Sequence, residues 1–149
     1  MYHICSANER DYDELTALWE DSVRATHHFL SEDDIAALRP LLRQCYMPAL
    51  AVSVCRNAQG AALGFMGTAE GRLEMLFVAP EHFGSGVGRA LVTQAIAHAG
   101  VRELDVNEQN PGASAFYQRL GFEVVGRSPL DGEGRPFPLL HMRLKQSQE

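Results

Sequence analysis

Three glycines on alternate positions, in the segment Gly84-Ser85-Gly86-Val87-Gly88-Arg89, carry the strongest chemical signal in the chain. Glycine lets the backbone turn sharply and approach a ligand closely, because it has no side chain. An apolar strand over Arg72–Val78 precedes the glycines, and an amphipathic helix that ends near Gly100 follows them. The first turn of a helix presents unpaired N–H groups and the positive end of its dipole. A strand, a glycine turn and a helix N-terminus in this order predict a phosphate-binding cradle.

The same glycines are compatible with two further structures. They could form a tight turn that packs the strand on the helix without any ligand. A dinucleotide-binding fold fits less well, because it needs the spacing G-x-G-x-x-G, which Gly84, Gly86 and Gly88 do not have. No lysine follows the glycines as it does in a nucleotide-binding P-loop.

The elements that must position this cradle follow from hydrophobic periodicity. The pattern predicts an α/β protein, an α+β arrangement with a mixed sheet, in the order β-α-α-β-β-β-α-β-α-β-β. The expected strands are 2–6, 49–56, 61–69, 72–78, 104–107, 122–126 and 139–144, and the expected helices are 10–25, one starting after Ser31, 87–99 and 112–120. Pro40 is expected to disturb or split the second helix. Because a helix separates strand 72–78 from strand 104–107, these two should pair in parallel within a mostly antiparallel sheet.

Length and composition limit the class of protein. The 149 residues are expected to form a single domain, 1–149. No apolar run approaches the ~18 residues of a membrane helix, and the N-terminus lacks the features of a secretory signal. The three cysteines are odd in number and widely spaced, so we expect free thiols, with Cys45 and Cys55 buried, and a cytoplasmic location. The net charge of −6 argues against binding to nucleic acid and is compatible with a cationic substrate.

Two motifs placed on these elements resemble the GNAT superfamily of acetyl-CoA-dependent N-acetyltransferases, and the resemblance covers essentially the whole chain. The first motif is Leu76-Phe77-Val78-Ala79-Pro80-Glu81 leading into Gly84–Gly88. The second is Asn107-Glu108-Gln109-Asn110, then Ala113, Phe116-Tyr117 and Leu120-Gly121-Phe122. The segments Ala25–Leu30 and Arg135–His141 look like the small bacterial YjaB-type branch of that superfamily. The resemblance implies acetyl-CoA as co-substrate and an amine-bearing acceptor, either a small molecule or a protein.

The resemblance also implies how the coenzyme is bound. In the family the glycine loop wraps the pyrophosphate with backbone amides, and the pantetheine arm pairs with the strand before the loop. Carried to this chain, the implied site is Leu76, Phe77, Val78, Phe83, Gly84, Ser85, Gly86, Val87, Gly88, Arg89, Asn110, Phe116 and Tyr117. Phe83 departs from the family pattern, which has Gln or Arg there, and a phenyl ring cannot donate to a phosphate. We therefore expect weaker coenzyme binding but not its loss, with Arg127 as a candidate substitute donor.

Acetyl transfer to an amine needs a base for the ammonium proton, N–H donors for the developing oxyanion and an acid for the leaving thiolate. The strand backbone near Phe77 is the expected oxyanion donor. Tyr117 matches the family tyrosine whose hydroxyl lies near the CoA sulfur, so the resemblance makes it the expected acid; packing in the core is the alternative. Glu74 is the expected base, since it lies on the strand that enters the loop, where some family members carry a glutamate. An exposed charge, or an ion pair with Arg72, is the alternative for Glu74.

The acceptor is expected to contact the segment between the first two helices. His27, His28 and Phe29 lie in this segment, which lines the acceptor site in the family, and histidine can act as a base or a recognition group. Glu70 is a second candidate base beside the acceptor. His141 lies in the last strand, which can border the acceptor cleft in the family. For these histidines an ordinary polar or structural role is the alternative, and no spacing of His, Cys or Asp predicts a metal site.

The expected function is therefore direct transfer of an acetyl group from acetyl-CoA to an amine, by a monomer or homodimer. No cysteine is placed for an acyl-enzyme intermediate. The alternative is a catalytically weak acyl-CoA-binding or sensor protein on the same fold, which Phe83 and the absence of an assured base leave open. Turnover separates the two hypotheses, since only the enzyme releases free CoA when an amine is supplied.

Overall fold

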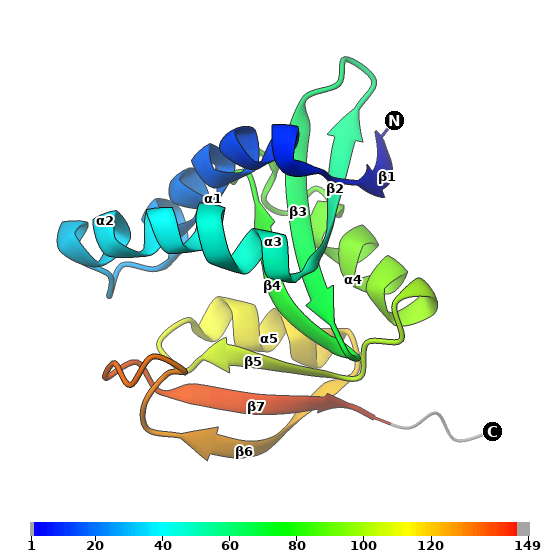
Figure 1. Ribbon diagram of the computed structural model, residues 1–149. Coiled ribbons are helices and arrows are strands. Elements are labelled where there is room, and N and C mark those ends of the chain that lie inside the picture. The colour runs from blue at the N-terminus through cyan, green and yellow to red at the C-terminus, as the bar shows by residue number, and fades with distance from the viewer. Residues whose placement is uncertain (1, 146–149) are drawn as a thin grey trace.

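The computed structural model describes residues 2–145, which form one seven-stranded sheet with helices on both faces (Figure 1). The strands lie in the order β1-β2-β3-β4-β5-β7-β6. Their bounds are β1 (Tyr2–Ser6), β2 (Ala51–Asn57), β3 (Ala62–Ala69), β4 (Arg72–Val78), β5 (Glu103–Asn107), β6 (Phe122–Ser128) and β7 (Leu139–Leu144). The main helices are α1 (Tyr12–Thr26), α2 (Glu32–Leu41), α3 (Met47–Ala49), α4 (Val87–His98) and α5 (Pro111–Arg119). This confirms the expected fold class and mixed sheet.

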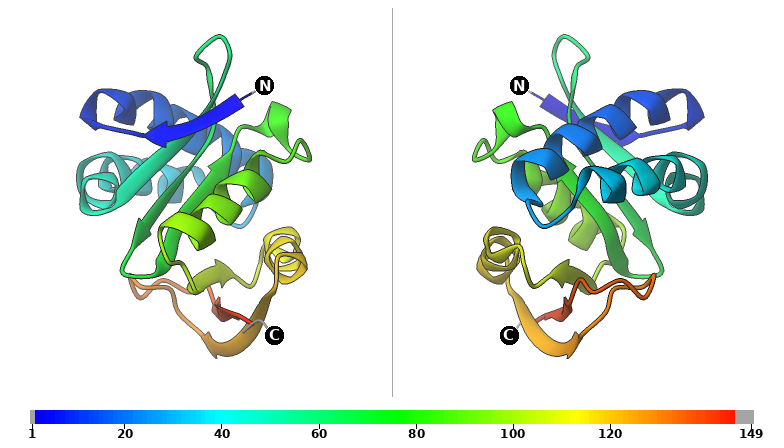
Figure 2. Two further views of the ribbon diagram at one scale, coloured as in Figure 1. Left: turned by 90° about the vertical axis from the view of Figure 1, so that its right-hand side faces the viewer. Right: turned by 90° about the vertical axis from the view of Figure 1, so that its left-hand side faces the viewer.

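The helices divide into two layers. Helices α1 to α3 cover one face of the sheet, and α4 and α5 cover the other (Figures 1 and 2). Helix α1 buries the stripe expected from its periodicity, Leu15, Leu18, Trp19 and Val23. On the opposite face α4 buries Val87, Leu91, Val92 and Ala95. Each layer therefore has its own apolar core, with the sheet between them.

Strands β4 and β5 diverge at the centre of the sheet. Their parallel pairing is confined to Arg72 with Glu103 and Leu73 with Leu104. From Glu74 onward β4 has no partner in β5, so that edge of its backbone is open. The register of β3 against β4 also shifts between Gly67 and Thr68, which leaves Glu74 as the extra residue of a β-bulge. A bulge re-aims a side chain and is often found beside an active site.

Helix α2 begins as the sequence predicts but continues beyond Pro40. Ser31 caps it, accepting a hydrogen bond from the Asp34 backbone N–H at 3.1 Å. Pro40 lies inside α2, and the chain continues through a π-helical turn (Leu42–Tyr46) into α3. Proline cannot donate a backbone hydrogen bond, and a π turn absorbs such a disturbance without ending the helix. Because the π turn changes the helical period, Cys45 is exposed, contrary to expectation. Cys55 is buried, as expected.

Candidate active site

The loop between β4 and α4 presents backbone N–H groups in the arrangement that a phosphate-binding cradle needs. Gly84 and Gly86 have φ angles of 77° and 91°, a region that side chains disfavour. Gly86 is the N-cap of α4, and no side chain caps this helix. The first backbone bond of the helix runs from the Ala90 N–H to the Gly86 oxygen, so the N–H groups of the first turn have no helical partner. These unpaired donors fit an anion such as a pyrophosphate.

Further residues of the loop stabilise the loop itself. The Ser85 hydroxyl and N–H both donate to the His82 carbonyl oxygen, at 2.5 and 3.2 Å, so Ser85 holds the turn together. A Cβ on Gly88 would lie 3.3 Å from the Phe116 ring, so glycine at that position lets α4 pack against α5.

Phe83, Arg89 and Arg127 are expected beside the phosphates, and they differ in exposure and in whether another group already binds them. Phe83 is 45% exposed, and Arg89 is exposed on the first turn of α4. Arg127 is not a substitute donor at the loop as it stands, because its guanidinium makes two hydrogen bonds to Glu108, at 2.6 and 3.0 Å.

A cavity of about 170 Å³ occupies the gap between the diverging strands β4 and β5. Tyr117 of α5 lines it and is only 8% exposed, with its ring held edge-on by Phe116 and Phe122. Burial raises the pKa of Tyr117 well above its usual range, so the phenol keeps its proton at neutral pH. Asn110 caps α5 by accepting a hydrogen bond from the Ala113 N–H, and it lines the same cavity. Leu76 and Phe77 line it from β4.

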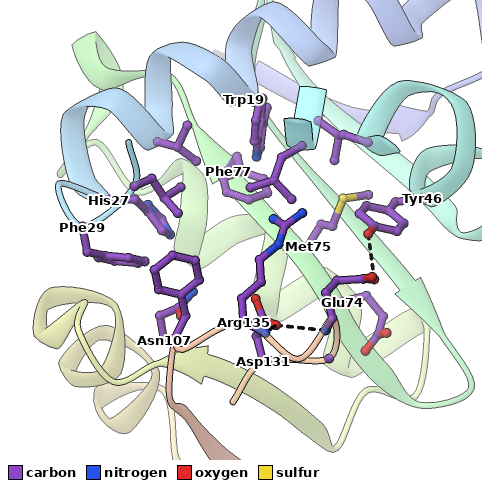
Figure 3. A pocket seen from close by; sticks show the side chains of 17 residues that line it. Trp19, His27, Phe29, Tyr46, Glu74, Met75, Phe77, Asn107, Asp131 and Arg135 are labelled. Carbon is purple, nitrogen blue, oxygen red and sulfur yellow. Dashed lines mark hydrogen bonds between the residues drawn. The ribbon is translucent and has the colours of Figure 1, made fainter. Parts of the chain in front are cut away.

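A second cavity, of about 340 Å³, lies between α1, α2, β4 and the loop that joins β6 to β7 (Figure 3). Aromatic rings make up much of its wall: Trp19, Phe29, Tyr46, Phe77 and Phe137. Two contacts hold the loop in place over this cavity. The Tyr46 hydroxyl donates to Glu133 at 2.9 Å, and the rings of Phe29 and Phe137 lie 5.5 Å apart.

The two cavities meet at β4, because five residues line both: His27, Glu74, Met75, Phe77 and Asn107. Glu74 accepts a hydrogen bond from Arg72 at 3.2 Å, and its side chain is 41% exposed. Glu74 therefore forms the ion pair with Arg72 and also has access to both cavities. The Asn107 Oδ1 atom is buried and has no hydrogen-bond partner among residues 2–145. It needs an N–H donor from a ligand or from water.

His27 is a neutral group at this junction. Its Nδ1 lies 2.7 Å from the Thr26 hydroxyl. Burial, and secondarily the charge of the adjacent His28, lowers the pKa of His27 to about 4. At pH 7 its imidazole is uncharged and can accept or donate a hydrogen bond, but it is a poor base for an ammonium group.

Apart from the loop residues 83–89 and Phe116, four residues that the sequence suggests for the site line neither cavity. His28 is exposed, and Glu70 lies in the β3–β4 turn with a φ of 51°. Val78 packs against the α4–α5 core instead. His141 is hydrogen-bonded to Asp105 at 2.6 Å and to the Ser128 hydroxyl at 2.7 Å, so its two ring nitrogens are both engaged. The structure therefore does not bring these side chains into contact with an acceptor in either cavity.

Several residues at the two cavities are not predicted as site residues: Trp19, Tyr46, Asn107, Asp131, Glu133, Arg135 and Phe137. Asn107, Arg135 and Phe137 lie in segments that carry the family resemblance, but no role is predicted for them from the sequence. Periodicity places Trp19 in the core, where its ring indeed packs while also lining the cavity. Those of the β6–β7 loop lie in a polar segment without periodicity. Only the clustering of Asp131, Glu133 and Arg135 around two glycines indicates a functional loop.

The residues present fit acetyl-CoA. The glycine loop offers unpaired N–H groups, β4 has an open edge from Glu74 onward, and Asn107 has an unsatisfied acceptor in the adjoining cavity. Within residues 2–145 no three His, Cys, Asp or Glu side chains are grouped as a metal site would require. No helix in the described part of the chain is both long and apolar enough to span a bilayer.

Comparisons with known proteins show which family the chain resembles. A family model described as "Acetyltransferase (GNAT) domain" matches residues 49–124. The peptidyl-lysine N-acetyltransferase YjaB of Escherichia coli (strain K12) is 41% identical over 139 residues, which span 93% of this chain and 94% of that protein. The solution structure of apo YjaB from Escherichia coli superposes with a TM-score of 0.90 at 37% identity, covering 99% of both chains.

A more distant structure supports the fold alone. The PaiA N-acetyltransferase from Thermoplasma acidophilum, solved in complex with coenzyme A, superposes with a TM-score of 0.75 at 18% identity and covers 97% of this chain and 99% of its own. Together with the cradle and the paired cavities, the family match and the 41% identical relative lead to one conclusion. The chain belongs to the GNAT acetyltransferase family and is an N-acetyltransferase that uses acetyl-CoA.

Proposed function

We propose that this enzyme acetylates the side-chain amine of lysine in proteins or peptides. The observation that carries the proposal is the meeting of two cavities at Glu74, one beside the glycine loop and α5 and the other open to an acceptor. The relative YjaB of Escherichia coli bears the name peptidyl-lysine N-acetyltransferase. A lysine side chain is long, thin and cationic, and the acceptor cavity suits it.

The acceptor cavity combines aromatic and acidic groups. The rings of Trp19, Phe77 and Tyr46 offer apolar surface to the four methylene groups of lysine. Aromatic faces also attract an ammonium group through cation–π interactions. Glu74, at the junction, provides the carboxylate toward which the ammonium would point.

For the coenzyme, the N–H groups of the glycine loop would bind the pyrophosphate, with Arg89 as an exposed cation nearby. Leu76, Phe77 and Val78 would offer the open β4 edge to the pantetheine arm, while Asn110 and Phe116 support this region from α5. Bound acetyl-CoA supplies an activated acetyl thioester that a neutral amine can attack.

Proton transfer would be divided between two side chains. Glu74 would take a proton from the acceptor ammonium, directly or through one water, which leaves the amine neutral and nucleophilic. Tyr117, whose phenol stays protonated because it is buried, would donate a proton to the leaving CoA thiolate in the cavity between β4 and β5. The open β4 backbone near Phe77 would donate a hydrogen bond to the developing oxyanion.

Transfer would be direct, with no acyl-enzyme intermediate. Neither cavity is lined by a cysteine among the described residues, so a covalent acetyl-cysteine has no place at the junction. We also propose a reducing, cytoplasmic setting, which the free thiols of Cys5, Cys45 and Cys55 support.

A peptide with a free α-amine and one internal lysine tests the acceptor class. The peptide is incubated with acetyl-CoA and the enzyme, and tandem mass spectrometry locates the added acetyl group. Acetylation of the lysine side chain, abolished in Glu74→Gln with acetyl-CoA affinity retained, is the expected result. Acetylation of the α-amine alone would contradict the proposed acceptor, and full activity of Glu74→Gln would remove Glu74 as the base.

A further inference from the structure

Arg135 is the cation of the acceptor cavity. It lies in the β6–β7 loop, and its half-buried side chain extends from the loop into the cavity (Figure 3). Hydrogen bonds of the loop fix the backbone position from which the Arg135 side chain extends. The Arg135 N–H donates to Asp131 Oδ1 at 2.8 Å, and the Arg135 carbonyl oxygen accepts from the Asp131 and Phe137 N–H groups. The loop therefore directs this side chain inward for structural reasons of its own.

The carboxylates around Arg135 are already engaged with different groups. Asp131 uses Oδ1 to accept hydrogen bonds from the N–H groups of Glu133 and Arg135, at 2.9 and 2.8 Å. Glu133 accepts from the Tyr46 hydroxyl. Glu74 accepts from Arg72. Within residues 2–145 no ion pair involves the Arg135 guanidinium, whereas ten ion pairs hold other arginines.

A guanidinium in such a place is suited to bind an anion. It presents five N–H donors in a planar fork that matches the two oxygens of a carboxylate. Aromatic walls reduce the competition from water, which strengthens a hydrogen bond between charged groups. The net charge of −6 would otherwise repel an anionic acceptor, so a cation inside the cavity is needed to admit one.

We propose that Arg135 binds a carboxylate of the acceptor, so that the acceptor carries an acidic group close to the amine that is acetylated. The inference rests on the proposed function, in that the acceptor is a lysine amine, and it names a second group that the acceptor must carry. The carboxylate can belong to an Asp or Glu next to the acceptor lysine in a peptide, or it can be the α-carboxylate of a free amino acid. Both sources present the same chemistry to Arg135.

Matched peptides test the pairing. Two peptides with blocked termini carry one lysine next to either Glu or Gln, and free lysine is compared with lysine amide. For the wild-type enzyme we expect kcat/KM for the Glu peptide, or for free lysine, to exceed that of its uncharged partner by about tenfold or more, since a hydrogen bond to a charged group contributes ~1.5–3 kcal/mol. Arg135→Gln should remove this preference, and Arg135→Glu should reverse it in favour of a peptide with Arg beside the lysine.

Arg143→Gln is the matched control. Arg143 lies on β7 and is 62% exposed, with its nearest carboxylate, on Glu103, 3.9 Å away, and it lines neither cavity. This variant should keep the wild-type preference. Acetyl-CoA affinity, measured by calorimetry, should be unchanged in all three variants, which excludes misfolding as the cause of any loss.

Binding of the same acceptors to the CoA-saturated protein, measured by calorimetry, separates this inference from the proposed function. If the carboxylate-bearing acceptors bind more tightly, and only with Arg135 present, the inference stands even when no lysine is acetylated and the proposed function fails. Acetylation of both peptides at equal rates, with equal affinities, overturns the inference while the proposed function stands. No binding of any carboxylate-bearing acceptor also overturns the inference.

Discussion

In the proposed mechanism, Tyr117 and Glu74 divide the proton chemistry between a buried phenol and a partly exposed carboxylate. Tyr117 is packed between two aromatic rings, and its pKa is raised by burial, so it is suited to donate a proton and not to accept one. Glu74 lies at a bulge where the two cavities meet. The separation of roles thus follows from where each side chain lies.

Replacing Tyr117 with Phe removes the proposed acid while preserving the ring contacts. We expect kcat to fall by about a hundredfold, the lower end of what a general acid contributes. Acetyl-CoA affinity should change by less than about threefold, because we propose that backbone groups provide most of the contacts to the coenzyme. Steady-state kinetics and calorimetry measure the two quantities.

Tyr12→Phe serves as the control for loss of a tyrosine hydroxyl. Tyr12 begins α1, where its ring lies under the Arg43 guanidinium, and it lines neither cavity. This variant should retain wild-type kcat. Equal activity of Tyr117→Phe and wild type would exclude Tyr117 as the acid.

At this scale the sequence predicts residues that belong to motifs and misses residues that only the fold brings together. The glycine loop, Tyr117 and Asn110 follow from local spacing. Arg135 and Tyr46 are separated by a large part of the chain and line the same cavity only because the β6–β7 loop lies opposite the π-helical turn (Leu42–Tyr46). No local pattern encodes such a meeting.

At the scale of elements, the glycine loop depends on backbone conformations that only glycine adopts easily. Gly84 has a φ of 77°, and a Cβ placed there would meet no atom within 4 Å. Gly84→Ala should therefore cost about 1–2 kcal/mol of stability through backbone strain alone. We also expect acetyl-CoA binding to weaken by about tenfold, because the relaxing loop turns its N–H groups away from the phosphates.

Gly60→Ala is the matched control, because it introduces the same kind of backbone strain at a distance from the site. Gly60 lies in the β2–β3 turn with a φ of 85° and equally open surroundings. Chemical unfolding should show a similar loss of stability in both variants, whereas calorimetry should show weaker acetyl-CoA binding only in Gly84→Ala. A similar effect of both variants on binding would argue against a cradle at the loop.

Periodicity predicts most elements but not their distortions. The apolar stripes of α1 and α4 locate these helices within a few residues. The second strand begins at Ala51 and not at residue 49, because the helix after Pro40 continues through a π turn into α3. The divergence of β4 from β5 arises from tertiary packing, and so does the bulge at Glu74. These distortions create the site, and alternation of apolar residues carries no signal for them.

At the scale of the whole molecule, the half-buried His27 links stability to pH. Its pKa of about 4 in the folded protein lies below the ordinary value near 6.5, so the unfolded chain binds the extra proton first as the pH falls. The contribution of His27 is fully present above about pH 6.5 and is lost progressively down to pH 4. Between pH 7.5 and 5 we expect wild type to lose about 2 kcal/mol through this residue.

Urea unfolding at both pH values measures this effect. His27→Gln should show a smaller loss of stability between pH 7.5 and 5 than wild type, because glutamine does not titrate. His28→Gln, at the exposed neighbouring position, should behave as wild type. An identical pH dependence for His27→Gln and wild type would show that His27 is not buried as an uncharged group.

The most direct test of the enzyme as a whole is the release of CoA thiol from acetyl-CoA in the presence of a lysine peptide. The comparison is the same peptide with norleucine in place of lysine, which keeps the apolar stem and removes the amine. We predict release that saturates with the lysine peptide, proceeds at the background rate with the norleucine peptide, and yields one acetylated lysine for each thiol. Equal release with both peptides would mean that the acetyl group passes to water and not to an amine, and would contradict acetyl transfer to lysine.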